Sequence, residues 1–186
     1  MLNKSPKRIV IVGSAGVGKT TLLNSIKKRL ELKVISERAR EICNRLGYKN
    51  LYEIKDHDKF RFLVLKEQIK FEEKYKEFLS DRSTIDCWVH WIRWSWNSTK
   101  TYESEEYYKL AYIQALKYSH IIFIPRLFES KEEDGFRWNN EDYQKQIDRL
   151  FREMLLEWQL IGRTYIVESK DLKERIKEVI KYLKSC

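Results

Sequence analysis

Residues 8–20 constrain the fold of this chain more than any other stretch. They read Arg-Ile-Val-Ile-Val-Gly-Ser-Ala-Gly-Val-Gly-Lys-Thr, so a G-x-x-x-x-G-K-T pattern directly follows an apolar, β-branched run. Glycines at this spacing let a loop fold so tightly that its backbone N–H groups converge on a phosphate chain. A helix that begins near Lys19 would add its positive N-terminal end. We therefore predict a buried strand, a phosphate-binding loop and a helix, in that order.

The side chains of this loop predict two cofactors, ATP and Mg²⁺. Lys19 would reach the β- and γ-phosphates, and the Thr20 hydroxyl would ligate the metal ion. Three of the chain's six glycines lie in the loop, which concentrates flexible backbone there. The residues predicted to contact the nucleotide are Gly13, Ser14, Ala15, Gly16, Val17, Gly18, Lys19, Thr20 and Thr21.

Composition bounds the remaining possibilities. The chain has 37 Lys and Arg against 28 Asp and Glu, a formal net charge of +9, which favours anionic partners. Cys43, Cys87 and Cys186 are scattered, as expected of reduced thiols and not of a disulfide framework or a zinc site. No run of 18 apolar residues and no signal-peptide pattern occurs, so we expect a cytoplasmic protein without a membrane span.

Strand and helix patterns alternate along the chain, which predicts a parallel sheet covered on both faces. We expect one domain, residues 1–186. Further strands are predicted at 32–36, 77–82, 120–125 and 165–167. Helices are predicted at 37–46 (with Ser36 as N-cap and Gly47 as C-cap), 56–78, 85–96, 107–118, 142–161 (ending at Gly162) and 172–183, with a polar break at 98–105 and a polar loop at 127–140.

In such sheets the ligand lies beyond the carboxyl ends of the strands. The residues at or just past these predicted ends are Gly13, Glu37, Asp81, Arg126 and Glu168. We therefore expect these five residues to gather at one edge of the sheet.

Two classes of nucleotide-hydrolysing protein fit the sequence poorly. A motor-type ATPase usually has an apolar strand that ends in Asp-Glu, whereas the run 121–124 ends in Pro125-Arg126. A GTPase usually has Asp-x-x-Gly and Asn-Lys-x-Asp motifs, and this sequence has neither. These differences favour phosphoryl transfer to an acceptor.

The element Asp81-Arg82-Ser83 resembles a strand end of thymidylate kinases and deoxynucleoside kinases. With Asp86 it is also similar to the D-R-x-x-x-D element of ribosylnicotinamide kinase-like domains, which are often grouped with AAA-type ATPases. Residues 36–41 and the Asp-Gly-x-Arg stretch at 134–137 resemble the same group. The resemblance implies a P-loop NTPase fold, an α/β/α sandwich with a five-stranded parallel sheet and a small lid. It also implies an ATP- and Mg²⁺-dependent kinase for a nucleoside, a nucleotide or a related metabolite.

The resemblance and the strand-end positions suggest roles for four residues. Asp81 would orient Mg²⁺ through water, and Arg82 would clamp the phosphate or ribose of the substrate. Glu37 would bind or deprotonate the acceptor hydroxyl, and Asp86 would bind acceptor hydroxyls or steady Arg82. The simpler alternatives are ordinary ion pairs and, for Glu37, a favourable position in the first turn of a helix.

A lid is predicted at about residues 126–141, where Arg126 and Arg137 flank a polar segment and would reach the transferred phosphate. Trp88, Trp91, Trp94 and Trp96 predict core packing or, alternatively, one ring that stacks on the acceptor with His90 or Tyr102 nearby. His57 and His120 are expected on a helix surface and at a strand edge, without a metal role.

Three functions stay open at this point. The first is a kinase with a small-molecule acceptor. The second is an ATPase or switch that acts on a protein partner. The third is a kinase or ATPase that acts on nucleic-acid ends, which the net charge permits but does not favour. The sequence leaves the oligomeric state open, including a homodimer.

Overall fold

The fold is built on a five-stranded sheet in which every pairing is parallel. The computed structural model describes residues 6–95, 100–127 and 140–185. The spatial order of the strands is β2-β3-β1-β4-β5, which confirms the predicted parallel five-stranded sheet. The strands are β1 (Arg8–Val12), β2 (Lys33–Ile35), β3 (Phe78–Asp81), β4 (His120–Phe123) and β5 (Thr164–Ile166).

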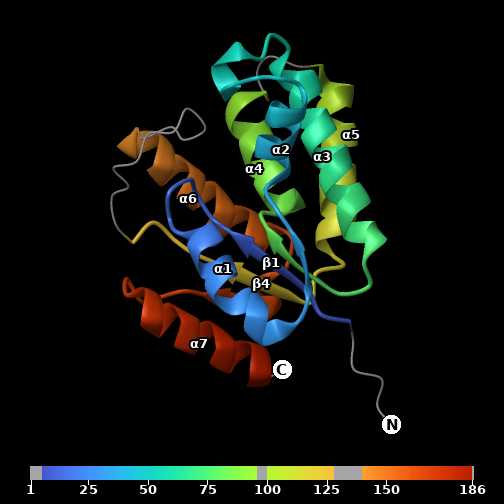
Figure 1. The fold of residues 1–186 in the computed structure, drawn as a ribbon. Helices are drawn as coiled ribbons and strands as arrows, with labels where there is room; N and C mark the ends of the chain where they lie inside the picture. The colour runs from blue at the N-terminus through green and yellow to red at the C-terminus, as the bar shows by residue number, and fades with distance from the viewer. Residues whose placement is uncertain (1–5, 96–99, 128–139, 186) are drawn as a thin grey trace.

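Helices cover both faces of the sheet and complete the predicted α/β/α sandwich (Figure 1). On one face, α1 and α7 lie side by side; on the other lie α3 to α6, and α2 packs against the start of α3. The helices are α1 (Lys19–Leu30), α2 (Arg38–Arg45), α3 (His57–Lys74), α4 (Thr84–Trp94), α5 (Thr101–Ala115), α6 (Glu141–Glu157) and α7 (Leu172–Ser185), with short 3₁₀ turns η1 (Leu51–Glu53) and η2 (Ile161–Arg163).

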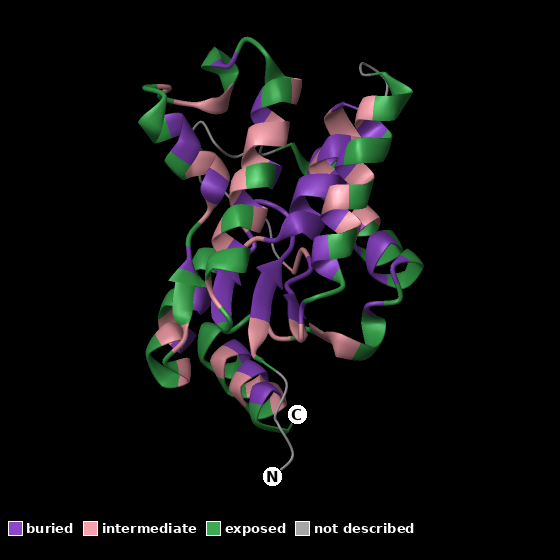
Figure 2. Cartoon of the chain, turned by 90° about the vertical axis from the view of Figure 1, so that its right-hand side faces the viewer, coloured by how far each residue is buried: buried purple, intermediate pink, exposed green. Residues whose placement is uncertain are grey.

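The central strand β1 divides its side chains between the two cores. Val10 and Val12 pack with the α3–α6 side, while Ile9 and Ile11 pack with α1 and α7. All four are fully buried, because successive side chains of a strand point to opposite faces and both faces are covered here. Figure 2 shows this buried centre beneath helices whose outer faces are exposed. The stiff, buried strand gives the loop that follows it a fixed starting point.

The start of α5 and the end of α3 differ from the sequence prediction. The polar stretch 98–105 was predicted as a break, yet α5 begins at Thr101 and buries Ser104, whose hydroxyl accepts a hydrogen bond from Trp91 Nε1 at 3.0 Å. The long helix α3 ends at Lys74 and not at residue 78, because Phe78 is already paired in β3. Tertiary contacts therefore override the local polarity pattern.

The predicted caps also changed in part. Glu37, not Ser36, is the N-cap of α2, and the Ser36 hydroxyl instead bonds the side chains of Arg38 and Glu41. Gly47 does follow the end of α2 with a φ of 78°, a backbone conformation that suits glycine, as predicted.

The end of α6 was predicted too late. The helix stops at Glu157, because the chain turns through Gln159 at φ 56° and buries Trp158 and Leu160. Gly162 lies in η2 and does not end the helix. Strand β5 accordingly starts one residue earlier than predicted, at Thr164. No helix among the described residues combines the length and apolarity that crossing a membrane requires.

Candidate active site

The loop between β1 and α1 has the backbone shape that the glycine spacing predicts. Gly13, Gly16 and Gly18 have φ values of 142°, 77° and 90°, which side-chain-bearing residues rarely adopt. A Cβ at Gly13 would lie 2.4 Å from the carbonyl oxygen of Ile124. The loop is thus pressed against the end of β4, and only glycine fits at its first position.

Lys19 lies buried at the start of α1 and folds back over the loop. Its Nζ donates hydrogen bonds to the carbonyl oxygens of Gly13 at 3.0 Å and Ser14 at 2.7 Å. Burial lowers the pKa of Lys19 to about 8, helped by the positive charge of Arg82. The lysine is therefore held at the mouth of the loop, next to a second cation.

The loop residues fit a phosphate chain. The buried Ser14 hydroxyl has no hydrogen-bond partner within the described part of the chain, which is costly unless a ligand satisfies it. Gly18, at the N-cap position of α1, has no side chain that would cap the helix. The first N–H groups of α1 therefore remain for an anion, and the helix dipole favours one there.

Thr20, in the first turn of α1, meets Asp81 at the end of β3. The Thr20 hydroxyl donates to Asp81 Oδ2 at 2.5 Å, and the Asp81 carboxylate is buried at the end of β3. Hydroxyl and carboxylate oxygens are the ligands that Mg²⁺ takes, usually together with substrate phosphates. The residue types and their contact fit the predicted metal site.

Arg82 joins the predicted acidic residues in one cluster. Its Nε donates to Glu37 Oε1 at 2.7 Å, and its Nη1 to Asp86 Oδ1 at 3.3 Å. Asp86 Oδ2 accepts a further bond from the Ser83 hydroxyl at 2.8 Å. Three elements supply this cluster: the start of α2, the end of β3 and the first turn of α4.

The charges of this cluster shift one another's pKa values. Burial raises the pKa of Asp86 to about 6, although Arg82 and Lys19 oppose the change. Burial would also raise the pKa of Glu37, but Arg82 and Lys19 together outweigh it and the net shift is downward. The pKa of Arg82 is raised, because Glu37, Asp86 and Asp81 outweigh its burial. Of the two carboxyls bonded to Arg82, Asp86 is thus the one whose pKa lies nearer to neutral.

A cavity of about 690 Å³ adjoins the cluster. Its volume lies within the range of small-molecule sites. It is lined by Ala15, Glu37, Ala39, Leu51, Tyr52, Lys55, Asp56, His57, Asp58, Phe60, Arg61, Val64, Arg82, Asp86, Cys87, His90, Trp94, Tyr107 and Tyr143. Ala15 belongs to the phosphate-binding loop, so the loop and the cavity share a wall.

The tryptophans divide between the two predicted roles. Trp88 and Trp91 are buried in the core; Trp91 stacks on Tyr107 with ring centroids 4.2 Å apart. Trp94 lines the cavity and donates through Nε1 to the Tyr143 hydroxyl at 3.2 Å. Trp96 lies outside the described residues. Tyr102 is 60% exposed and does not line the cavity.

His90, in contrast, does line the cavity, as Trp94 does. Its Nδ1 is 3.2 Å from the Tyr143 hydroxyl. Burial and the nearby charges of Arg82 and Lys19 lower its pKa to about 3, so it is neutral. Of the other two histidines, His57 is exposed on a helix surface, as expected, whereas His120 does not lie on an edge strand. His57 begins α3 and lines the cavity, and His120 lies on β4 between β1 and β5.

Arg126, one of the two predicted lid arginines, does not join the cluster. Arg126 bonds α6 instead, through Gln144 at 3.2 Å and Glu141 at 3.3 Å, and its backbone N–H donates to Asp148. Glu168 is exposed after β5, outside the cavity wall. Arg137, with the rest of the Asp-Gly-x-Arg stretch, lies outside the described residues. Of the five expected strand-end residues, Gly13, Glu37 and Asp81 belong to the site described above.

Sequence reasoning missed several cavity residues. Tyr143 follows the N-cap of α6, and Arg61 and Asp58 lie in the first turns of α3, where Arg61 Nη1 donates to Asp58 Oδ1 at 3.1 Å. An arginine and an aspartate three residues apart read as an exposed helical ion pair. Only the packing of α3 against α4 turns this pair toward the cavity.

The chain is similar to a known protein family over most of its length. Residues 8–175 match the profile of a family described as "AAA domain". The chain belongs to this family. No curated protein sequence matches the chain.

Solved structures of kinases share the fold. A NadR protein in complex with NAD and AMP-PNP superposes with a TM-score of 0.72 at 17% identity, covering 96% of this chain and 49% of that chain. Deoxyadenosine kinase from M. mycoides matches with a TM-score of 0.70 at 20% identity, covering 95% and 98%. Thymidylate kinase from Candida albicans matches with a TM-score of 0.66 at 13% identity, covering 97% and 92%.

These likenesses confirm the predicted P-loop kinase fold. This chain spans about half the length of the NadR proteins it matches, 49% in one case and 46% in another. The nucleoside and nucleotide kinases, in contrast, are matched over nearly their whole length. At these identities the likeness concerns the fold, and the chemistry must be argued from the site itself.

Proposed function

We propose that this protein is an ATP- and Mg²⁺-dependent phosphotransferase whose acceptor is a small hydroxyl compound: a nucleoside, a nucleotide or a related metabolite. One observation carries the proposal. The cavity lined by Ala15 of the phosphate-binding loop is also lined by Glu37, Arg82 and Asp86. A phosphate donor on the loop and an acceptor in the cavity would therefore meet at this cluster.

The donor side is assigned to four groups. The N–H groups of the loop and Lys19 would hold the phosphate chain. The donor would then be fixed in position for reaction with a bound acceptor. Thr20 and Asp81 would hold Mg²⁺, which supplies charge neutralisation on the phosphate oxygens when bound. Phosphoryl transfer depends mainly on such positioning and charge, so this set accounts for most of the chemistry expected.

The acceptor side is assigned to Asp86, Arg82 and Glu37. Asp86, with a pKa of about 6, is suited to take the proton of an acceptor hydroxyl near neutral pH. Arg82 would stabilise negative charge on the transferred group. Glu37 bonds Arg82 at 2.7 Å and has a lowered pKa, so we assign it to holding the arginine in place.

The cavity wall favours an acceptor with a ring and no phosphate of its own. Trp94 and Tyr143 offer aromatic surface to a base or a similar ring. The two arginines of the wall, Arg61 and Arg82, are both paired with carboxylates. A phosphorylated acceptor would have to displace one of these ion pairs, so we favour a nucleoside-like acceptor.

The test is ADP formation from ATP and Mg²⁺ in the presence of separate nucleosides, nucleotides, hydroxyl metabolites and oligonucleotides. The proposal predicts turnover that a small acceptor stimulates strongly. Slow hydrolysis that no acceptor changes would select an ATPase or switch, and stimulation by oligonucleotide ends alone would select a nucleic-acid enzyme.

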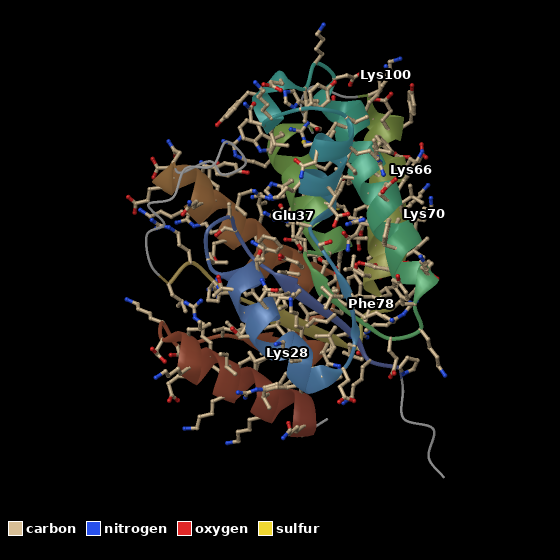
Figure 3. All side chains as sticks on the ribbon, in the orientation of Figure 1. Lys28, Glu37, Lys66, Lys70, Phe78 and Lys100 are labelled. Atoms are coloured by element: carbon tan, nitrogen blue, oxygen red, sulfur yellow. The ribbon has the colours of Figure 1, made fainter. Side chains whose placement is uncertain are left out.

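A matched pair of variants ties the activity to the site. Lys19→Ala removes the buried lysine and should reduce turnover on the order of a thousandfold. Lys28→Ala removes an exposed lysine at the other end of the same helix, beside α7 (Figure 3), and should leave turnover unchanged. Equal activity of both variants would contradict the donor assignment.

A further inference from the structure

Arg175 is a buried cation that the proposed reaction does not use directly. It lies in the first turn of α7 with 3% of its surface exposed, whereas Lys173, Lys177, Lys181 and Lys184 of the same helix are exposed. It shares the buried stripe of α7 with Val179 and Leu183, four and eight residues further on. An arginine is expensive in such a stripe unless its hydrogen bonds are met.

The guanidinium joins two loops of the donor side. Its Nη1 donates to the carbonyl oxygen of Val17 at 2.9 Å, inside the phosphate-binding loop. Its Nε donates to the carbonyl oxygen of Ser169 at 2.7 Å, in the connection between β5 and α7. The approach is close: a Cβ at Gly18 would lie 3.2 Å from Nη1. Glycine therefore suits position 18 for two reasons: it leaves room for the arginine, and it tolerates the φ of 90° found there.

The geometry of the peptide bond gives this contact a consequence. A trans peptide is planar, and its C=O and N–H groups point in opposite directions. Because Arg175 holds the Val17 carbonyl on the α7 side, the N–H of Gly18 points to the opposite side of the loop. Gly16 and Gly18, on either side of Val17, are both flexible at positive φ, so the Val17–Gly18 peptide would turn easily without an anchor.

We propose that Arg175 is a positioning residue for the donor: it fixes the Val17–Gly18 peptide so that the Gly18 N–H faces the phosphate chain, and it ties the loop to the β5–α7 connection. The inference rests on the proposed use of the loop as the nucleotide site. The Arg175 side chain bonds backbone carbonyls and is placed behind the loop, so its effect passes through Gly18.

The test measures the dissociation constants of ATP and of inorganic tripolyphosphate by displacement of a fluorescent nucleotide. Arg175→Met should weaken both ligands by the same factor, about ten- to a hundredfold, as expected for losing a hydrogen bond from a charged group. Arg175→Lys should give a smaller loss, because one ammonium group cannot bond both carbonyls. Lys181→Gln removes an exposed charge from α7 and should change neither value.

Tripolyphosphate lacks the base and the ribose of ATP. It therefore separates an effect on phosphate binding from an effect on binding of the nucleoside part. If Arg175→Met and Arg175→Lys both bind tripolyphosphate as tightly as the wild type, the inference is overturned, whatever happens to ATP. Should Arg175→Met fail to fold, the loss in Arg175→Lys decides the question. Failure of the wild type itself to bind either ligand would instead refute the proposed nucleotide site.

Discussion

Arg82 occupies the left-handed region of the backbone map, with φ at 80°, although it is not a glycine. Such a conformation costs on the order of 1–3 kcal/mol and persists only where the surroundings enforce it. Here its backbone N–H donates to Ile11 at 3.1 Å, and Glu37 and Asp86 hold its side chain. The strain lies where β3 delivers the arginine to the cavity, which supports a functional role for this residue.

The motif Asp81-Arg82-Ser83 could be found in the sequence, but this backbone conformation could not. Local preference places arginine at negative φ, and only the contacts from β1, α2 and α4 reverse it. The same holds for Glu37, whose bond to Arg82 joins residues that are 45 positions apart. Residue types at strand ends are thus predictable, whereas their pairings depend on the assembled sheet.

The lowered pKa of Lys19 predicts that nucleotide affinity depends on pH. In the free protein the pKa is about 8, and bound phosphate would raise it, so binding above pH 8 requires uptake of a proton. We expect ATP affinity to fall by up to about tenfold per pH unit above 8. Calorimetry at pH 8.5 in two buffers of different ionisation enthalpy would detect the proton. Constant affinity from pH 7 to 9.5 without proton uptake would contradict this.

At the scale of elements, the loop between β1 and α1 was predictable and the lengths of α3, α5 and α6 were less so. The loop follows from a motif whose glycines each have a steric reason. The start of α5 depends on Ser104, a polar residue that becomes buried by bonding Trp91. The signal for Arg175 was present as a charge within the apolar stripe of α7, since it precedes Val179 by one helical turn.

Two glycines test the steric argument for the loop. Gly13→Ala would force a Cβ to within 2.4 Å of the Ile124 carbonyl oxygen, whereas a Cβ at Gly47 meets nothing within 4 Å. Gly47→Ala should cost only about 1 kcal/mol for its positive φ. Gly13→Ala should cost about 1–3 kcal/mol more, because the strand end must move, and should also weaken ATP binding. If Gly13→Ala and Gly47→Ala had equal unfolding free energies in urea, the close packing of this loop would be contradicted.

At the scale of the whole molecule, a second polar cluster lies apart from the cavity. Glu72 of α3 is fully buried and accepts hydrogen bonds from Gln68 at 2.7 Å, Gln114 at 2.8 Å and the Tyr118 hydroxyl at 2.9 Å. The Tyr118 hydroxyl also accepts from the backbone N–H of Thr84, the first residue of α4. The cluster thus joins α3, α4 and the end of α5. Burial raises the pKa of Glu72 to about 7, from an ordinary 4.5.

This pKa predicts how the stability of the fold changes with pH. Between pH 4.5 and 7 the folded protein keeps the Glu72 proton that the unfolded chain has lost, so the unfolding free energy falls as pH rises. The loss attributable to Glu72 approaches about 3 kcal/mol and is complete above pH 7.

The side chain of the variant Glu72→Gln stays neutral, so its unfolding free energy should not fall in this way. Relative to the wild type, the variant should therefore become more stable as pH increases. Its neighbour Glu73 is exposed and pairs with Lys117 at 2.9 Å, so Glu73→Gln serves as the control. Urea unfolding between pH 4.5 and 8 measures all three proteins. Parallel curves for the wild type and Glu72→Gln would mean that Glu72 titrates normally.

The order of the strands brings the loop after β1 and the cavity together. Asp81 and Ile11 are paired in register, so β3 delivers Asp81 and Arg82 next to the strand that leads into the loop. The phosphate-binding loop was evident from the sequence; the cavity was not, since residues from several elements far apart in the chain line it. The proposed function therefore depends on the assembled sheet edge and on no single motif.

The proposed phosphoryl transfer is tested most directly by following the γ-phosphoryl group itself. ATP labelled at the γ-phosphate is incubated with the protein, Mg²⁺ and the small acceptor that most stimulates ADP formation, and labelled products are counted against ADP. We predict one labelled acceptor for each ADP, and a strong loss of this transfer in Asp86→Asn, which keeps the shape of the side chain. Label that appears only as inorganic phosphate, at a rate that no acceptor changes, would contradict the account.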